Sequence, residues 1–243
     1  MKKNINAIVF SLAIIVAAYL LGYAVIHRNN ADGHISVTGL GETDFTSDLI
    51  VWEGTFNSEH PNLKTAYDQL EADKAVIIDY LQNKGVKEDE LVFKAVQSRK
   101  NVKAKYSNEG KYIGEDFLGY VLTQQLKIES KNVATIEKIS REITELLNKG
   151  ITFYSQPPRY YYTKLSDLKI EMISKATADA KQRAENIAEN SGSQLGDLRS
   201  AKMGIFQITG QNSSEDYSWG GTFNTSSKEK TASITMKLTY DID

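Results

Sequence analysis

Histidines and carboxylates are the side chains of this sequence that could transfer protons or bind a metal. There are only three histidines, His27, His34 and His60, and none is paired at a metal-ligand spacing such as i, i+4. The adjacent acids Glu115 and Asp116 are explained by solvated charges in a turn. Because the sequence has no cysteine, thiol nucleophiles, zinc ribbons, iron–sulfur clusters and disulfides are excluded. We therefore expect no metal site.

Glycine-containing strings also differ from the motifs that bind phosphates or expose a nucleophile. Gly39-Leu40-Gly41 lacks the third glycine of a dinucleotide fingerprint and precedes β-like residues instead of a helix. The string from Gly192 to Gly196 is not Gly-x-Ser-x-Gly, and Gly110-Lys111 lacks the earlier glycine of a phosphate loop. We expect no catalytic residue, no cofactor and no enzyme activity. The alternative is a ligand-sensing or hydrolase-like domain with a pocket between sheet and helices.

Aromatic side chains form two groups that fit a surface for a partner. Three consecutive tyrosines follow Pro157-Pro158-Arg159 and place rings on both faces of a strand, whose prolines indicate a sheet edge. A second group is spread along the Gly/Ser-rich segment 211–227, which we expect to be a long loop. The alternatives are ordinary sheet packing and a loop folded over its own core. The candidate interface residues are Tyr160, Tyr161, Tyr162, Tyr217, Trp219 and Phe223.

The overall composition and charge limit the class of protein to which these residues belong. Of 243 residues, 41% are hydrophobic and 25% are charged, which excludes a disordered, collagenous or polytopic membrane protein. Residues 1–28 hold three basic and no acidic side chains, so the formal charge of −2 becomes −5 for residues 29–243. An acidic domain without a basic stripe is a poor nucleic-acid binder, and we expect no nucleic-acid partner.

An uncharged apolar run extends from Ala7 to Ile26, with Lys2 and Lys3 before it and Arg28 after it. As a helix it would be about 30 Å long, the thickness of the hydrocarbon core of a bilayer. This predicts a signal anchor that crosses the inner (cytoplasmic) membrane once through residues 7–26 and leaves the bulk of the chain periplasmic or extracytoplasmic. The alternative is a signal peptide cleaved near Gly22-Tyr23-Ala24, which would release the protein into the periplasm.

The rest of the chain alternates between β-like and helical patterns and predicts an α+β fold. The division expected is an N-terminal transmembrane helix over 1–28, a linker over 29–33 and one domain over 34–243. Helical periodicity predicts helices from Pro61 to Gly85, from Asn132 to Gly150, and from Leu165 to Ser191. The β-like segments are 35–40, 47–57, 90–106, 112–129, 151–163, 199–209 and 231–242.

Two short patterns bear on how the helices pack. The string Asn83-Lys84-Gly85-Val86 recurs as Asn148-Lys149-Gly150-Ile151, which indicates either two strand–helix–strand units or merely a common helix stop. Four alanines recur at i+4 spacing in the third helix and allow a close approach, either within the chain or between subunits. They are Ala176, Ala180, Ala184 and Ala188.

The ordered strings resemble the SIMPL domain family over roughly Ile35–Asp241. Ile35–Glu42 looks like the family's opening strand with Gly-x-Gly, and Ala176–Ala184 resembles its A-x-x-D-A-x-x-K/R-A signature. Thr46-Ser47-Asp48 departs from the Pro-Asp step of many members, and the loop Tyr217–Phe223 has no evident counterpart. The resemblance implies an antiparallel sheet with about three helices. It transfers no catalytic residue, because none is established for the family.

The resemblance also implies the kind of function to expect. SIMPL proteins are periplasmic or surface proteins, of which some assemble as homo-oligomeric rings and some are associated with oxidative-stress tolerance. We accordingly expect a homo-oligomer, or a binder of an envelope protein, that acts in envelope maintenance or oxidative-stress tolerance through edge strands and aromatic surfaces. An animal relative takes part in kinase signalling, so an adaptor for a signalling partner is a further alternative.

Overall fold

The computed structural model describes residues 2–28, 33–216 and 218–242, and the chain divides into two compact units. Unit 1 comprises residues 1–41, 173–204 and 234–243, and unit 2 comprises residues 42–172 and 205–233. The helices are α1 (Lys2–Arg28), α2 (Leu63–Asn83), α3 (Val133–Glu142) and α4 (Leu165–Asn190), with 3-10 helices η1 (Glu88–Glu90) and η2 (Ile143–Lys149). The strands are β1 (His34–Thr46), β2 (Leu49–His60), β3 (Leu91–Phe93), β4 (Gln97–Tyr106), β5 (Tyr112–Ser130), β6 (Phe153–Ser155), β7 (Arg159–Tyr161), β8 (Leu195–Met203), β9 (Gln207–Gly210) and β10 (Glu229–Ile242).

Helix α1 contains the apolar run, and its side chains are described from residue 9 to residue 24. Among the described residues, no helix has both the length and the apolar character that a membrane crossing requires. A helix that crosses the hydrocarbon core of a bilayer needs about 20 predominantly apolar residues. The expected transmembrane helix over residues 7–26 is therefore corrected. Of the expected linker 29–33, residues 29–32 lie outside the described residues.

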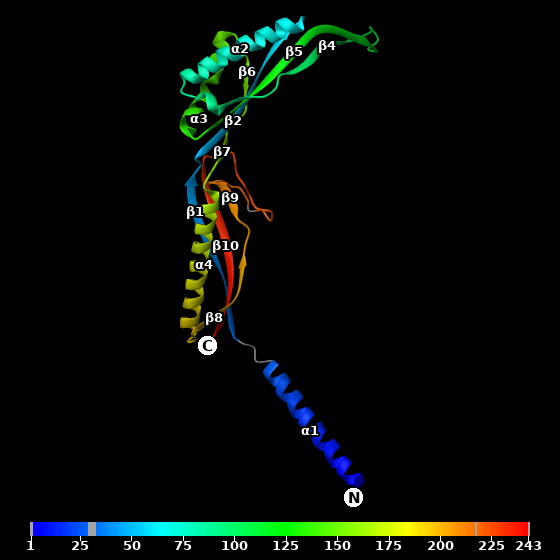
Figure 1. Ribbon diagram of the computed structural model, residues 1–243, viewed down its shortest axis with the longest axis vertical. Coiled ribbons are helices and arrows are strands. Elements are labelled where there is room, and N and C mark those ends of the chain that lie inside the picture. The colour runs from blue at the N-terminus through cyan, green and yellow to red at the C-terminus, as the bar shows by residue number, and fades with distance from the viewer. Residues whose placement is uncertain (1, 29–32, 217, 243) are drawn as a thin grey trace. The chain divides into compact units, whose positions relative to one another are not determined.

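In unit 1, a helix packs very closely on a sheet. Strand β10 lies between β1 and β8 and runs antiparallel to β8, and residues 173–190 of α4 lie beside these strands (Figure 1). The four alanines of α4 are fully buried there, which confirms that their stripe packs within the chain. A Cβ atom on Gly39 of β1 would lie 2.2 Å from the carbonyl oxygen of Ala176. The lack of a side chain at Gly39 allows this close contact. Strand β1 continues to Thr46 instead of ending near Leu40 as expected.

In unit 2, the sheet has the order β3-β5-β2-β6, with β4 also pairing with β5 and β7 with β2. The ladder between β2 and β5 is antiparallel from Ile50↔Ser130 to His60↔Tyr120. Helices α2 and α3 pack on this sheet and close its core (Figure 1). The core side chains include Trp52, Phe56, Leu70, Ile77, Leu81, Leu126, Ile128, Ile136 and Ile139. In its described residues the chain thus forms two separate sheets, whereas the sequence predicts one.

Two β-like stretches are divided more finely than expected. The stretch 90–106 breaks between β3 and β4, where the Lys94 carbonyl accepts a hydrogen bond from the side chain of Gln124 at 2.9 Å. The stretch 151–163 breaks between β6 and β7 at Pro157-Pro158, because proline lacks the N–H that a sheet ladder requires. A turn joins the two long strands, with Gly110 N–H donating to the Ser107 carbonyl at 2.9 Å.

The repeated Asn-Lys-Gly string ends two helical segments in the same way. Gly85 and Gly150 have φ values of 95° and 78°, a left-handed conformation that glycine adopts easily. The residue after each glycine donates its N–H to a carbonyl five positions back, which is the hydrogen bond of a Schellman helix stop. The two bonds run from Val86 to Leu81 (3.0 Å) and from Ile151 to Leu146 (3.1 Å).

The same two segments also begin alike. Asn62 accepts the N–H of Thr65 at 3.2 Å before α2, and Asn132 accepts the N–H of Thr135 at 3.3 Å before α3. Asparagine at this position satisfies an N–H that the helix itself cannot pair. Each capped helix follows one of the two long paired strands, β2 or β5. The similarity between the two helical segments therefore includes both their first and their last residues.

Candidate functional site

The consecutive tyrosines of the predicted interface lie at β7 and just beyond it. Tyr160 is only 8% exposed and belongs to the core of unit 2, and burial raises the pKa of its hydroxyl. Tyr161 and Tyr162 are half-buried, and the ring of Tyr162 packs on Phe45 with centroids 4.8 Å apart. Tyr160 is therefore a core residue, and only its two neighbours are partly exposed to solvent.

The second predicted group lies on the 211–227 loop of unit 2. Tyr217 lies outside the described residues, whereas Trp219 is 96% exposed and Phe223 is 52% exposed. The carboxylate of Glu215 accepts the N–H of Gly210 at 2.8 Å and the side-chain amide of Asn224 at 2.5 Å. These bonds, the one from Gly210 first, lower the pKa of Glu215. The exposed indole of Trp219 is therefore carried on a loop with internal hydrogen bonds.

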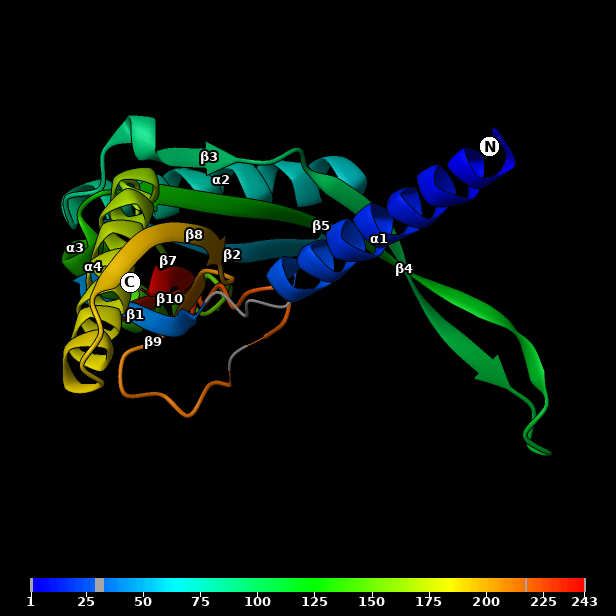
Figure 2. The ribbon, with the colours of Figure 1, turned by 90° about the horizontal axis from the view of Figure 1, so that it is seen from below.

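The hairpin of β4 and β5 carries exposed apolar side chains that the sequence did not identify as a surface. The hairpin projects from the rest of unit 2 (Figure 2). The register places Val102 opposite Phe117 and Tyr106 opposite Tyr112, and the two tyrosine rings lie 6.1 Å apart. The exposed apolar side chains of the hairpin are Val102, Tyr106, Tyr112, Ile113, Phe117 and Leu118.

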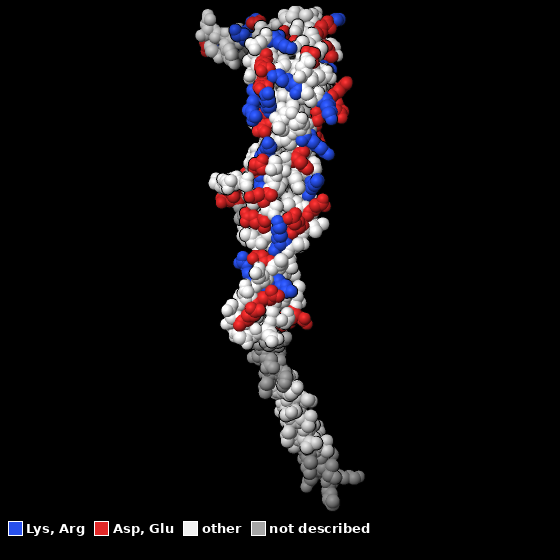
Figure 3. All heavy atoms as spheres, turned by 90° about the vertical axis from the view of Figure 1, so that its left-hand side faces the viewer, with Lys and Arg blue, Asp and Glu red and all other residues white. Residues whose placement is uncertain are grey.

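The edge of this hairpin is basic. Strand β4 carries four cationic side chains, Arg99, Lys100, Lys103 and Lys105, and in the described residues its ladder partner is β5. Lysines on an edge strand disfavour pairing with a further strand. A partner would therefore contact the apolar face of the hairpin more readily than its free edge. Elsewhere, Figure 3 presents a face on which acidic and basic side chains are interspersed.

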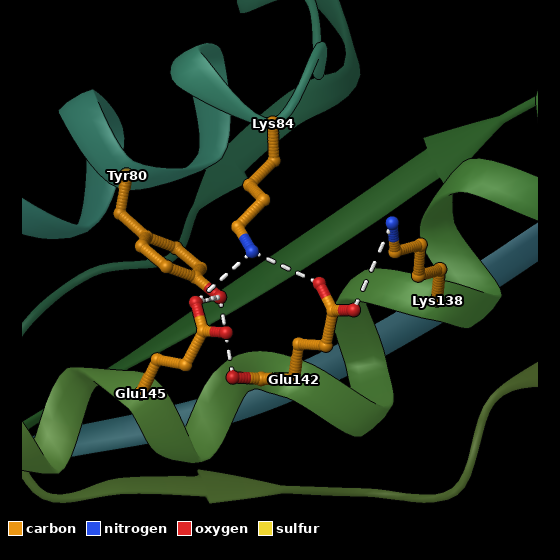
Figure 4. Close-up of polar contacts among 5 residues, drawn as sticks. All are labelled: Tyr80, Lys84, Lys138, Glu142 and Glu145. Carbon is orange, nitrogen blue, oxygen red and sulfur yellow. Dashed lines mark hydrogen bonds and ion pairs between the residues drawn. The ribbon is translucent and has the colours of Figure 1, made fainter.

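Five polar residues link the end of α2 to α3 and η2 (Figure 4). The Lys84 ammonium lies 2.9 Å from Glu142 and 3.0 Å from Glu145, and Lys138 lies 3.8 Å from Glu142. The hydroxyl of Tyr80 donates to Glu145 at 3.0 Å and to the Glu142 carbonyl at 3.2 Å. Because each of these polar groups has a partner within the cluster, the cluster joins two helical segments.

The pKa shifts in this cluster follow from the same contacts. Hydrogen bonds to Glu142 and Glu145 raise the pKa of Lys84, and the bond from Lys84 is the main cause that lowers the pKa of Glu145. Burial, followed by the bond to Glu145, raises the pKa of Tyr80. All three shifts favour the protonation states present at neutral pH. They are the signature of mutual stabilisation.

Lys230 is a buried cation elsewhere in unit 2. Its ammonium donates to the carbonyl oxygen of Tyr160, and burial lowers the pKa of Lys230 to about 8. The rings of Phe45, Tyr162 and Phe223 line the small space beside it. That space is too small to hold a water molecule. Across the described residues, no group of three or more histidine, aspartate or glutamate side chains could hold a metal ion.

In unit 1, the glycine-containing string and the signature of α4 meet. The carboxylate of Asp179 accepts the backbone N–H of Leu40 at 2.8 Å and the Nε–H of Arg183 at 2.9 Å. These two bonds, the one from Leu40 first, lower the pKa of Asp179. Together with the contact between Gly39 and Ala176, they attach α4 to β1.

Comparison with known families agrees with this arrangement. A family model described as "SIMPL: Protein of unknown function (DUF541)" matches residues 35–240. The chain belongs to the SIMPL family. A search of curated proteins finds no match.

The family assignment gives the two sequence strings a structural meaning. In this SIMPL domain, the Gly-x-Gly string allows the backbone of β1 to approach α4, and Asp179 of the helix signature binds that backbone. Both strings therefore maintain the fold of unit 1. The hairpin surface lies in unit 2 and includes none of these residues.

Proposed function

We propose that this SIMPL protein acts by self-assembly or by binding an envelope protein, in envelope maintenance or oxidative-stress tolerance, and that it does not catalyse a reaction. The observation that carries the proposal is the exposed apolar face of the β4–β5 hairpin. Six large apolar side chains are exposed on one projecting element. Two cross-strand pairs, Val102 with Phe117 and Tyr106 with Tyr112, bring exposed apolar side chains together, and exposed apolar patches are typical of interaction sites.

The chemistry of this face suits a protein partner. Tyrosine and phenylalanine combine a large buried area with few rotatable bonds, and both are enriched in protein interfaces. The basic edge of β4 directs association toward the face, because it disfavours a growing sheet. This differs from the edge-strand pairing expected from the sequence. Trp219 on the 211–227 loop offers a second, smaller contact in the same unit.

The perturbed polar groups support a non-catalytic role. Glu145 accepts a hydrogen bond from Tyr80 and forms an ion pair with Lys84. Lys230 lies beside a space that is too small for a substrate. A catalytic acid or base has to reach the proton it transfers, usually in an open cleft. These four groups are instead engaged in contacts that hold segments of unit 2 together.

For location, we propose the periplasm, with residues 1–24 acting as a signal peptide. The basic start, the apolar run and the small-x-small site at Gly22-Tyr23-Ala24 are the features of such a peptide. The intact mass of the protein from its native host tests this point. A mature chain beginning at residue 25 is expected, and a full-length mass would contradict cleavage.

The native mass of the purified protein as a function of concentration tests self-assembly. We expect an oligomer whose population falls when Phe117→Ser removes an aromatic ring from the hairpin face. The matched control is Leu147→Ser, because Leu147 is also exposed in unit 2 and lies on η2. A strict monomer at high concentration would exclude self-assembly. An oligomer equally weakened by both variants would exclude the hairpin as its interface.

A further inference from the structure

The solvent-facing side of the unit 1 sheet carries a polar hollow that the proposed function does not use. The alternation of buried and exposed residues along β1 and β10 directs one face toward α4 and the other toward solvent. On the solvent side, all three strands contribute to a hollow of about 330 Å³. Its lining residues are His34 and Ser36 of β1, Ser200 and Lys202 of β8, and Lys237 and Thr239 of β10.

Two lysines face each other across this hollow. The register of the antiparallel pair places Lys237 of β10 directly opposite Lys202 of β8. Side chains opposite each other on one face have Cβ atoms about 5 Å apart, so two like charges in these positions repel. Within the described part of the chain, neither ammonium has a carboxylate partner. Asp241, the acid near the end of β10, is instead paired with Arg199 at 3.4 Å.

Hydroxyl groups extend the hollow beside the lysines. Thr239 is directly opposite Ser200, and its hydroxyl donates to the Ser36 hydroxyl at 3.3 Å. A row of three hydroxyls thus crosses from β1 through β10 to β8. Hydroxyls can donate as well as accept, and each lysine offers three N–H donors. The hollow therefore combines positive charge with adaptable donors, the combination that binds oxyanions.

We infer that this hollow binds a phosphate-type oxyanion, either free phosphate or the phosphate group of a small ester. An anion between Lys202 and Lys237 replaces their repulsion with two charge-assisted hydrogen bonds. The hydroxyls of Ser36 and Ser200 bind its remaining oxygens. The volume of the hollow exceeds that of a bare phosphate ion and leaves space for the alcohol portion of an ester.

Titration of the full chain, followed by backbone amide NMR, tests the site. Inorganic phosphate and glycerol phosphate are added in separate experiments, each compared with chloride at the same ionic strength. Saturable shifts are expected at residues 34–36, 200–202 and 237–239. The double variant Lys202→Gln/Lys237→Gln should weaken binding by about tenfold or more, because it removes two charge-assisted bonds. Lys103→Gln, on the hairpin of unit 2, is the matched control and should bind as the unmodified protein does.

Thermal unfolding supplies a second test, in which a lysine substitution that weakens phosphate binding should raise the stability of the phosphate-free protein. In chloride, Lys202→Gln should raise the unfolding temperature, because it removes the repulsion between the two lysines. The same variant should lose most of the rise that phosphate gives the unmodified protein. Tighter binding of the ester would identify an esterified ligand, and equal binding would identify the free anion. Absence of saturable shifts with both ligands, or equal affinity in the double variant, would overturn the inference.

Discussion

The two halves of β5 carry apolar side chains but differ in what covers them. From Tyr120 to Ser130 the strand pairs with β2, and its inward residues are buried beneath α2 and α3. From Tyr112 to Leu118, within the described residues, it pairs with β4 alone and its apolar side chains are exposed. The covered half contributes to the core of unit 2. The open half has comparable side chains and no helix over them, so it is the half suited to a partner.

The largest expected effect comes from the same substitution in the two halves. Leu126→Ala removes a side chain that is 1% exposed in the core, and should lower the free energy of unfolding by about 4 kcal/mol. Leu118→Ala, at a position 47% exposed, should change it by about 0.5 kcal/mol or less. Urea unfolding monitored by circular dichroism measures both. Equal losses would show that the open half is also packed in solution.

Two glycines, one packed against α4 and one on an open loop, allow a second comparison of covered and open regions. Gly39→Ala places a Cβ atom 2.2 Å from the Ala176 carbonyl, so α4 must move away from β1. The expected loss of stability is about 3 kcal/mol, at the upper end for an overpacked contact. Gly220→Ala, on the 211–227 loop, meets nothing closer than 4.0 Å and should be nearly neutral. Thermal unfolding followed by circular dichroism distinguishes the two, and a neutral Gly39→Ala would contradict the close contact.

Local patterns in the sequence predicted much of this fold correctly. The Asn-Lys-Gly stops and the start of the second helix at Asn132 depend on residues a few positions apart, so they can be recognised without knowing the tertiary structure. The grouping of strands into separate sheets depends on segments such as β1 and β10, which are far apart in the chain. The transmembrane prediction was wrong, because no helix among the described residues has both the length and the apolar character that a crossing requires.

The candidate surfaces were harder to predict for a related reason. A strand with rings on both faces does not reveal which ring is buried, so Tyr160, a core residue, was grouped with its more exposed neighbours. Both halves of β5 contain large apolar residues, and the position of α2 and α3 decides which half is open. The lysines of the unit 1 hollow are 35 residues apart in the sequence and meet only through the pairing of β8 with β10.

The smallest expected effect concerns ion pairs, and it compares a pair that joins two helical segments with an exposed pair within one helix. Lys84→Gln removes two ion pairs that join α2 to α3 and η2, whereas Lys64→Gln removes one exposed pair with Asp68 within α2. Solvent screens both sites, so Lys84→Gln should lower the midpoint of thermal unfolding modestly, and Lys64→Gln should not change it measurably. Circular dichroism of both variants beside the unmodified protein measures the difference.

The pH dependence of that difference identifies the cause. The pKa of Glu145 is lowered in the folded state, so its contribution is present above its ordinary value of 4.5 and is lost as the pH falls through the folded value. The pKa of Lys84 is raised, so its contribution is present below its ordinary value of 10.5 and is lost only as the pH rises through the folded value. The midpoint difference between the unmodified protein and Lys84→Gln should therefore stay constant from pH 5 to pH 9 and shrink below about pH 4.5. A difference that persists in acid would instead assign the effect to packing of the Lys84 alkyl chain against Tyr80, whose ring centroid lies 5.3 Å from the ammonium.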